Sequence, residues 1–255
     1  MLRFLSILML IVFAALPASA EKVVAGLSQN RVSITATFVG SEILIFGAVK
    51  RDTPPPTDSP LQVIVVVEGP AHPVTVRKKD RRFGIWVNSD SIELAAAPSF
   101  YAVATSAPLT ETLSILDDLK HVISVERSIR ISDTPFTNQD PRDFTRALIR
   151  IREKSDLYKL MENSVELQEE TLFNTRIALP ANVTEGDYRT RIYLTRAGTV
   201  ASQYETVINV QKVGLERWIF NLAHEQPLIY GILSLVIAIA AGWGASALFR
   251  VILRT

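Results

Sequence analysis

Cysteine is absent from this 255-residue sequence, and histidine occurs only three times. The absence of cysteine excludes disulfide bonds, thiolate metal sites, redox pairs and lipid attachment through a thiol. The three histidines, His72, His121 and His224, lie far apart in the sequence, each without acidic residues at ligand spacing. We therefore expect neither a metal site nor a bound cofactor.

Net charge is also nearly absent, at +1 from 27 Lys and Arg against 26 Asp and Glu. Arg3 is the only charged residue in the first twenty, so the chain without residues 1–20 is formally neutral. A neutral chain offers no global field that recruits nucleic acid or cations, so we expect no nucleic-acid partner.

Catalytic motifs are missing as well. The sequence contains no G-x-S-x-G, no phosphate-binding glycine loop and no dinucleotide fingerprint. The adjacent acids Asp117-Asp118 and Glu169-Glu170 do not share a helix or strand face, which predicts solvated side chains. These observations argue against an enzyme.

Two long apolar runs are present, one at each end of the chain. The first, Phe4–Leu16, follows Arg3 and precedes the small residues Ala18-Ser19-Ala20. This pattern predicts a signal peptide at residues 1–20, the alternative being a retained membrane anchor. The second run, Leu228–Phe249, carries no charge, and as a helix it would span roughly 30 Å, the thickness of a bilayer core.

These runs predict a single-pass type I membrane protein with its N-terminal part outside and residues 250–255 inside. Arg250 and Arg254 flank the inner end in the sense of the positive-inside rule. Residues 213–227, directly before the span, form an amphipathic pattern. This pattern predicts a juxtamembrane helix in the membrane interface with Trp218 as anchor, the alternative being a helix packed on the outer domain.

Residues 21–212 have mainly β patterns. Arg31–Phe38 alternates apolar and polar side chains, and the continuous apolar run Leu61–Val67 is typical of a strand buried on both faces. Leu179–Tyr188 resembles the corner of immunoglobulin-like and fibronectin-like sandwiches, where a tyrosine bonds back to the preceding turn. Further strands are predicted at Ile43–Val49, Pro73–Val76, Phe83–Val87, Phe100–Thr105, Leu172–Leu179, Tyr188–Arg196, Val200–Glu205 and Val207–Lys212.

At about residues 108–160 the apolar residues repeat every three or four positions, which predicts a helical insertion between the strands. Pro108–His121 is predicted as one short helix, and Asp140-Pro141 is a good helix start. From there Phe144, Ala147, Leu148 and Ile151 share one face, opposite Arg146, Arg150, Arg152 and Lys154. The basic side is either solvated or docks on anionic headgroups or an acidic partner. The fold class is therefore mainly β, an immunoglobulin-like β-sandwich with a helical insertion, and one sandwich or two short ones both remain open.

Several stretches together resemble a known family. They are Val24–Ser28, Leu61–Gly69, Thr171–Ile177, the Leu179–Tyr188 corner, Gly214–Trp218 and Ala223–Gly231. They look like the alphaproteobacterial family of predicted single-pass membrane proteins of unknown function (Alph_Pro_TM). The resemblance implies a bacterial inner membrane, a periplasmic domain and, as a partner, a sulfite-exporter-type transporter. It supplies no catalytic or ligand residues.

Two sets of residues are candidates for interaction. The first is a basic hairpin tip, predicted to lie between two strands and able to bind anionic lipid or an acidic partner: Arg77, Lys78, Lys79, Arg81 and Arg82. The second is a stripe of small residues in the span, which would let another helix approach in a homodimer or a polytopic complex: Ala238, Ala241, Gly242 and Ala245.

The sequence favours a membrane-anchored periplasmic binding or scaffold protein, accessory to an envelope membrane complex or transporter. The alternative is a periplasmic enzyme or small-ligand receptor whose site is assembled from distant loops. A flat apolar patch would favour the accessory role, and a pocket lined by convergent polar groups would favour the enzyme or receptor.

Overall fold

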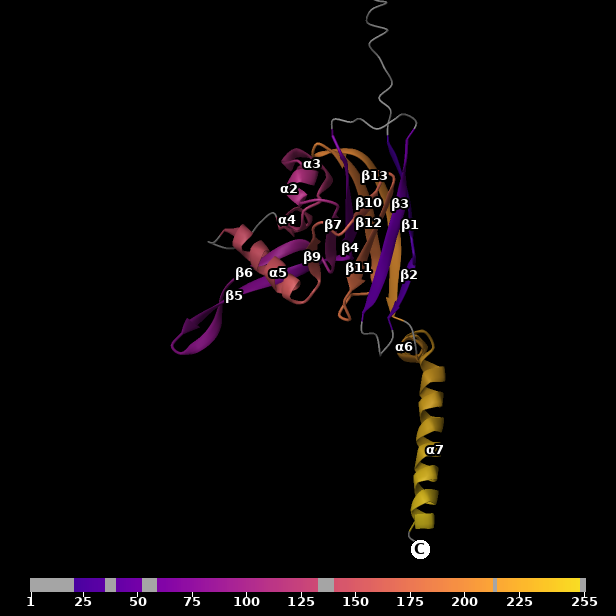
Figure 1. The fold of residues 1–255 in the computed structure, drawn as a ribbon. Coiled ribbons are helices and arrows are strands. Elements are labelled where there is room, and N and C mark those ends of the chain that lie inside the picture. Colours follow the sequence, from indigo (N-terminus) through magenta and orange to yellow (C-terminus); the bar gives the residue numbers. More distant parts are fainter. Residues whose placement is uncertain (1–20, 35–39, 52–58, 133–139, 213–214, 253–255) are drawn as a thin grey trace, which may run out of the picture. The chain divides into compact units, whose positions relative to one another are not determined.

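The computed structural model describes residues 21–34, 40–51, 59–132, 140–212 and 215–252. Within these residues the chain is mainly β, as predicted (Figure 1). It divides into two compact units, a larger one within residues 1–32 and 39–210 and a smaller one that includes residues 211–255. The predicted signal peptide and the end of the predicted strand Arg31–Phe38 lie outside the described residues.

The strands form three sheets. The four-stranded sheet consists, in spatial order, of β1 (Lys22–Leu27), β3 (Ser41–Lys50), β11 (Leu172–Leu179) and β10 (Glu166–Gln168). The six-stranded sheet consists, again in spatial order, of β2 (Arg31–Ile34), β13 (Thr199–Lys212), β12 (Gly186–Arg196), β4 (Leu61–Glu68), β7 (Tyr101–Thr105) and β9 (Tyr158–Met161). The three-stranded sheet consists of β5 (Ala71–Arg82), β6 (Ile85–Pro98) and β8 (Arg130–Ile131).

The six-stranded sheet is the middle layer of the larger unit. Its strand β4 is buried on both faces, which confirms the prediction from the Leu61–Val67 run. Ile64 and Val66 pack into a core shared with the helices and the three-stranded sheet. Val63 and Val65 lie on the opposite face of β4, where the four-stranded sheet forms the next layer (Figure 1).

Four helices lie between β7 and β9, close to the predicted insertion: α2 (Leu109–Thr112), α3 (Ile115–His121), α4 (Val125–Ser128) and α5 (Pro141–Lys154). The prediction of one helix over Pro108–His121 was wrong. Leu113 is extended, and Ser114 starts α3 by accepting a hydrogen bond from the Asp117 amide at 3.2 Å. A capping serine inside the apolar pattern therefore divides the helix in two.

Helix α5 begins as predicted. Asp140 accepts a hydrogen bond from the Arg142 amide at 2.9 Å, and Pro141 occupies the first turn. The predicted apolar face is correct for Phe144 and Leu148, which are buried. It is wrong for Ile151, which is 54% exposed while Ile149 is buried.

The basic run Arg77–Arg82 does not form the turn of its hairpin, which corrects the prediction. It belongs to β5, which pairs with β6, and the turn is Phe83-Gly84, with φ of 49° and 83°. A two-residue hairpin loop of type I′ has positive φ at both central positions, which glycine adopts at little cost. The same geometry at Ala197-Gly198 joins β12 to β13, and β13 is one continuous strand where two had been predicted.

The predicted tyrosine corner is present. The Tyr188 hydroxyl donates a hydrogen bond to the Thr184 carbonyl at 2.7 Å, and the side chain is fully buried. Burial raises the pKa of Tyr188 to about 12, so the hydroxyl remains a donor at neutral pH. The corner thus joins the start of β12 to the turn before it.

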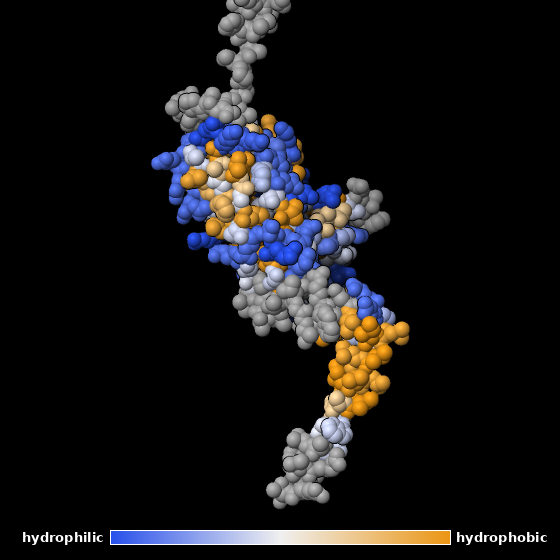
Figure 2. Space-filling model, turned by 90° about the vertical axis from the view of Figure 1, so that its right-hand side faces the viewer, coloured by the Kyte–Doolittle hydropathy of each residue, from blue (hydrophilic) through white to orange (hydrophobic). Residues whose placement is uncertain are grey.

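The smaller unit contains α6 (Leu215–Glu225) and α7 (Pro227–Ile252). Both helices were predicted. Within the described residues, Pro227–Ser246 is the one segment long and apolar enough to cross a membrane, with a mean hydropathy of 2.0. Helix α7 is apolar on the side that Figure 2 shows, as expected for contact with lipid.

Candidate functional site

The outer parts of β5 and β6 form a two-stranded ribbon that extends away from the sheets (Figure 1). We call residues 77–91 the arm. At its base Val76, Ile92 and Leu94 are buried in the core of the larger unit. Beyond Val76 no residue of the arm is buried, so the outer part presents both faces to solvent.

The predicted cations of the arm separate onto two faces. Because strand side chains alternate, Arg77, Lys79 and Arg81 share one face of β5. Their partners on β6 are Ser91, Asn88 and Trp86, so this face carries three cations and no acid. The other face carries both signs: Lys78 is opposite Asp90, Asp80 opposite Val87, and Arg82 opposite Ile85.

The tip of the arm is apolar and aromatic. Phe83 is fully exposed, at 107% relative accessibility, and Ile85 and Trp86 are 64% and 68% exposed. Sequence reasoning placed Phe83 inside a strand and expected the cations at the tip. The dipeptide Phe83-Gly84 between two β-patterned stretches was the available signal for the turn.

A hollow of about 370 Å³ lies between the base of the arm and α5. Its apolar walls come mainly from Phe144, Ala147 and Ile151, and cations stand at its edges. The lining residues are Val76, Arg77, Lys78, Lys79, Asp143, Phe144, Ala147, Arg150 and Ile151. The basic side of α5 therefore contributes Arg150 to a hollow with an apolar wall and a mainly cationic edge.

A flat apolar patch lies on part of the outer face of the four-stranded sheet. In the register of this sheet Val24, Ala48 and Leu172 form one row, and Phe46 stands in the next row opposite Gly26. Val24, Phe46 and Leu172 are about half exposed, at 55%, 46% and 54%. Figure 2 views the side on which β1 and β3 lie and shows hydrophobic side chains gathered there among hydrophilic ones.

The Phe46 ring lies across Gly26, where an added Cβ would come within 3.1 Å of ring carbons. The glycine therefore lets the ring lie against the sheet. Charged residues stand around the patch, with the pair Lys22 and Lys50 at one end of β1 and β3. An apolar centre with a charged rim is the usual anatomy of a protein interface.

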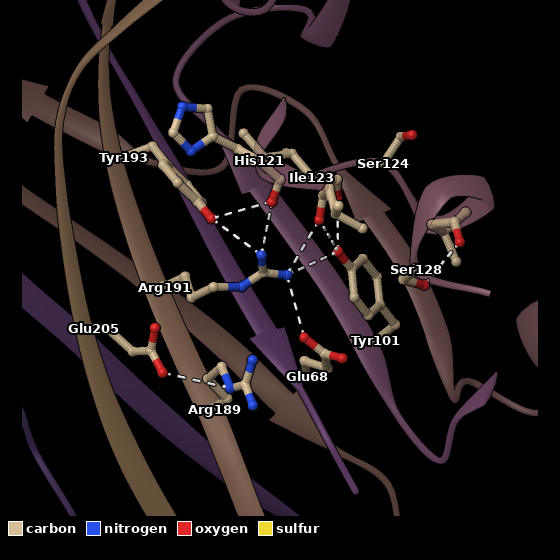
Figure 3. A network of polar contacts seen from close by, with 12 residues as sticks. Glu68, Tyr101, His121, Ile123, Ser124, Ser128, Arg189, Arg191, Tyr193 and Glu205 are labelled. Carbon is tan, nitrogen blue, oxygen red and sulfur yellow. Dashed lines mark hydrogen bonds and ion pairs between the residues drawn. The ribbon is translucent and has the colours of Figure 1, made fainter. Parts of the chain in front are cut away.

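A buried arginine on β12 contacts β4 and the end of α3 (Figure 3). Arg191 on β12 is 7% exposed and forms an ion pair with Glu68 on β4 at 3.2 Å. Its guanidinium also donates to the His121 carbonyl at 2.9 Å and the Val122 carbonyl at 3.2 Å. These carbonyls end α3, so a cation satisfies acceptors that a helix terminus leaves open.

Two tyrosines complete this cluster. Arg191 donates to the hydroxyls of Tyr193 at 3.0 Å and Tyr101 at 3.3 Å, and Tyr101 in turn donates to the Ile123 carbonyl at 2.9 Å. Burial raises the pKa of both tyrosines. Both hydroxyls stay protonated at neutral pH. The cluster therefore holds the α3–α4 corner on the sheet through neutral hydroxyls and one cation.

A second ionic cluster joins the first described residue to the sandwich. Glu21 accepts hydrogen bonds from Arg196 at 2.7 and 3.0 Å and from Arg51 at 2.8 Å. Glu170 also pairs with Arg196, at 3.1 Å. Hydrogen bonding from Arg196 is the main reason why the pKa of Glu21 is lowered.

The predicted solvation of the acidic pairs Asp117-Asp118 and Glu169-Glu170 holds only for Glu169, which is exposed. Asp118 is largely buried and accepts hydrogen bonds from the amides of Ile123 at 3.2 Å and Ser124 at 2.7 Å, in the turn between α3 and α4. Asp117 is also largely buried, and its carboxylate accepts a hydrogen bond from the hydroxyl of the capping Ser114 at 3.1 Å. Its other oxygen lies 3.9 Å from Nε2 of His121, so this histidine has an acidic neighbour at helical spacing, contrary to the prediction. Glu170 belongs to the ionic cluster, so these acids serve the fold. Within the described residues no three His, Asp or Glu side chains are placed to hold a metal ion.

The remaining predicted interaction residues lie on the two helices of the smaller unit. Trp218 is in α6, but its side chain lies outside the described part. The small residues of the span are exposed along α7: Ala238, Ala241, Gly242 and Ala245. They occupy one face because their spacing is three and four residues, and their role stays a prediction.

Comparison with known proteins matches most of this chain to one family. The family described as "Putative transmembrane protein (Alph_Pro_TM)" matches residues 22–251. No curated protein matches the chain.

Proposed function

The chain belongs to this Alph_Pro_TM family of transmembrane proteins, and we propose that it is a membrane-anchored binding or scaffold protein, accessory to a membrane complex or transporter. In this proposal residues 1–20 direct export and are removed, and the larger unit is an immunoglobulin-like domain in the periplasm. Helix α7 crosses a bacterial inner membrane, and residues 250–255 face the cytoplasm.

The flat apolar patch on the four-stranded sheet carries this proposal. Sheet faces that border water normally carry polar side chains, whereas Val24, Phe46 and Leu172 are adjacent and about half exposed. Contiguous exposed apolar surface on a folded domain marks a site of protein interaction. Because the domain is tethered to a membrane, we propose a polytopic membrane protein as its partner, such as a sulfite-exporter-type transporter.

The test is purification of the full-length protein from its own membranes in mild detergent, with identification of the proteins that remain bound. The patch variant is Val24→Thr, Phe46→Thr and Leu172→Thr, because threonine keeps β-propensity. The control is Ile115→Gln, Leu116→Gln and Leu119→Gln, which removes three exposed apolar side chains from α3.

We expect a polytopic membrane protein to accompany the native chain and the α3 control, and to be lost from the patch variant. Retention of the same partner by the patch variant would contradict the proposal, as would a native chain that retains no membrane protein. The small-residue stripe of α7 is a second contact surface in this proposal, within the bilayer.

The hollow beside α5 supports a different function, that of a small-ligand receptor. Apolar walls with Arg77, Lys79 and Arg150 at the edge suit a short amphiphile with an anionic head. Thermal unfolding in the presence of decanoate, with neutral octyl glucoside as control, tests this function. If the hollow binds such a ligand, decanoate should raise the Tm and octyl glucoside should not. The increase with decanoate should disappear in Arg150→Gln.

A further inference from the structure

The arm combines three properties that no contact within the described part of the protein explains. Its tip exposes Phe83, Ile85 and Trp86. One face behind the tip carries three cations, Arg77, Lys79 and Arg81, and no acid, as the register with β6 shows. The ribbon is also held rigidly at its base, where Val76 and Ile92 are buried.

We propose that the arm docks on the surface of an anionic lipid bilayer. Phe83, Ile85 and Trp86 enter the interface between headgroups and acyl chains, and the cationic face lies against the headgroups. This role is separate from the apolar patch, which lies on a different sheet, and it does not depend on the proposed partner protein.

The dimensions of the arm suit this arrangement. Strands rise about 3.3 Å per residue, so Lys79 and Arg77 lie about 7 and 13 Å behind Arg81. Arg81 is opposite Trp86, so the first cation of this face stands beside the aromatic tip. Interfacial elements bury their apolar side chains about 5–10 Å deep, which places a tip of this size in the interface and the cations at the headgroups.

The choice of lipid as partner follows from charge and residue type. An acidic protein would pair with the cations, but a row of cations behind an exposed tryptophan and phenylalanine is the pattern of membrane-interface anchors. Each Lys or Arg near an anionic surface raises affinity about fivefold at low salt, so the three cations together contribute about 100-fold. Since the arm is already ordered, little conformational entropy is lost on docking.

The experiment uses the full-length protein in nanodiscs of phosphatidylcholine. Binding in trans is measured by flotation with vesicles of equimolar phosphatidylglycerol and phosphatidylcholine, or of phosphatidylcholine alone. The variants are a cation variant (Arg77→Gln, Lys79→Gln, Arg81→Gln) and a tip variant (Phe83→Ser, Trp86→Ser). The matched control removes three exposed cations of the four-stranded sheet: Lys22→Gln, Lys50→Gln and Arg176→Gln.

We expect the native chain and the matched control to bind the anionic vesicles and not the neutral ones. The cation variant should lose about 100-fold in affinity at low salt, and the tip variant at least tenfold. Equal binding to both kinds of vesicle, or equal losses in the cation variant and its control, would overturn the proposal. Because the apolar patch is intact in every variant, partner recovery in mild detergent tests the accessory role separately.

A second measurement uses the absence of native cysteine. An environment-sensitive dye is attached to Ile85→Cys at the tip or, as control, to Ser91→Cys farther down the arm. Anionic vesicles should shift the emission at position 85 to the blue and leave position 91 unchanged. The same shift at both positions, or none at position 85, would show that the tip does not enter the bilayer.

Discussion

Replacement of Arg191 by methionine tests the buried cluster most directly. Methionine keeps much of the length of the side chain and removes all five hydrogen bonds that its guanidinium donates. The carboxylate of Glu68 and the carbonyls of His121 and Val122 then lose a cationic partner. We expect the free energy of unfolding to fall because these groups remain away from bulk water.

The magnitude follows from the burial of the pair. Loss of one partner of a fully buried ion pair costs about 3–5 kcal/mol. The Glu68 side chain keeps 21% of its accessibility, so water relieves part of the penalty and the lower end of the range applies, about 3 kcal/mol. For a domain of this size such a loss lowers Tm by about 6–12 °C.

A double-mutant cycle separates the ion pair from simple loss of packing. Glu68→Gln and the double variant Glu68→Gln, Arg191→Met are unfolded by urea alongside the single variants, with circular dichroism as the readout. The loss in free energy of unfolding of the double variant should be smaller than the sum of the losses of the two single variants by at least about 1 kcal/mol. The reason is that the double variant leaves no carboxylate unpaired. Hydrogen exchange in α3 and α4 should also accelerate in Arg191→Met, because Arg191 holds their corner.

Two results would refute this reasoning. A loss below about 1 kcal/mol in Arg191→Met would mean that the buried acceptors find other partners. Additive costs in the cycle would mean that Glu68 and Arg191 do not interact in the folded protein.

Features set by neighbouring residues could be predicted from the sequence. The burial of β4 follows from an unbroken apolar run, the start of α5 from Asp140-Pro141, and the Tyr188 corner from the spacing of its turn. Each is a local choice of backbone or burial that three to eight residues determine. The span of α7 belongs to the same group because its length and composition suffice.

Other features failed because distant segments decide them. The basic run Arg77–Arg82 has turn-like polarity, yet pairing with β6 places it in a strand. Glu170 looks like a surface acid, but its partner Arg196 comes from the far end of β12. The position of Arg191 could have been recognised in the sequence, because a charged residue within an apolar strand predicts a buried partner. The pattern does not identify that partner.

Three further predictions concern single residues of the sandwich and the span. Gly47→Ala should lower the free energy of unfolding by about 1–3 kcal/mol in urea titrations, because its Cβ would lie 2.9 Å from the Val24 carbonyl and even closer to the buried Phe173 ring; wild-type stability would show that the two strands can separate at no cost. Glu21→Gln should lower stability at pH 7, and this effect should shrink as pH falls below the ordinary carboxyl pKa of about 4.3 and disappear below the lowered pKa of the folded protein. The lowered pKa of Glu21 adds stability above the ordinary carboxyl pKa that is lost as pH falls through the folded value, so a gap between the two proteins that persists in acid would contradict the pairing with Arg196. Gly242→Leu should weaken crosslinking of α7 to a second copy or to a polytopic partner in native membranes, because small residues allow close helix contact. Gly244→Leu is its control, since both glycines have open space around them and two residues of helix place them on opposite faces. Equal crosslinking in the two variants would remove the stripe as a contact surface and leave the sheet patch as the route to the partner.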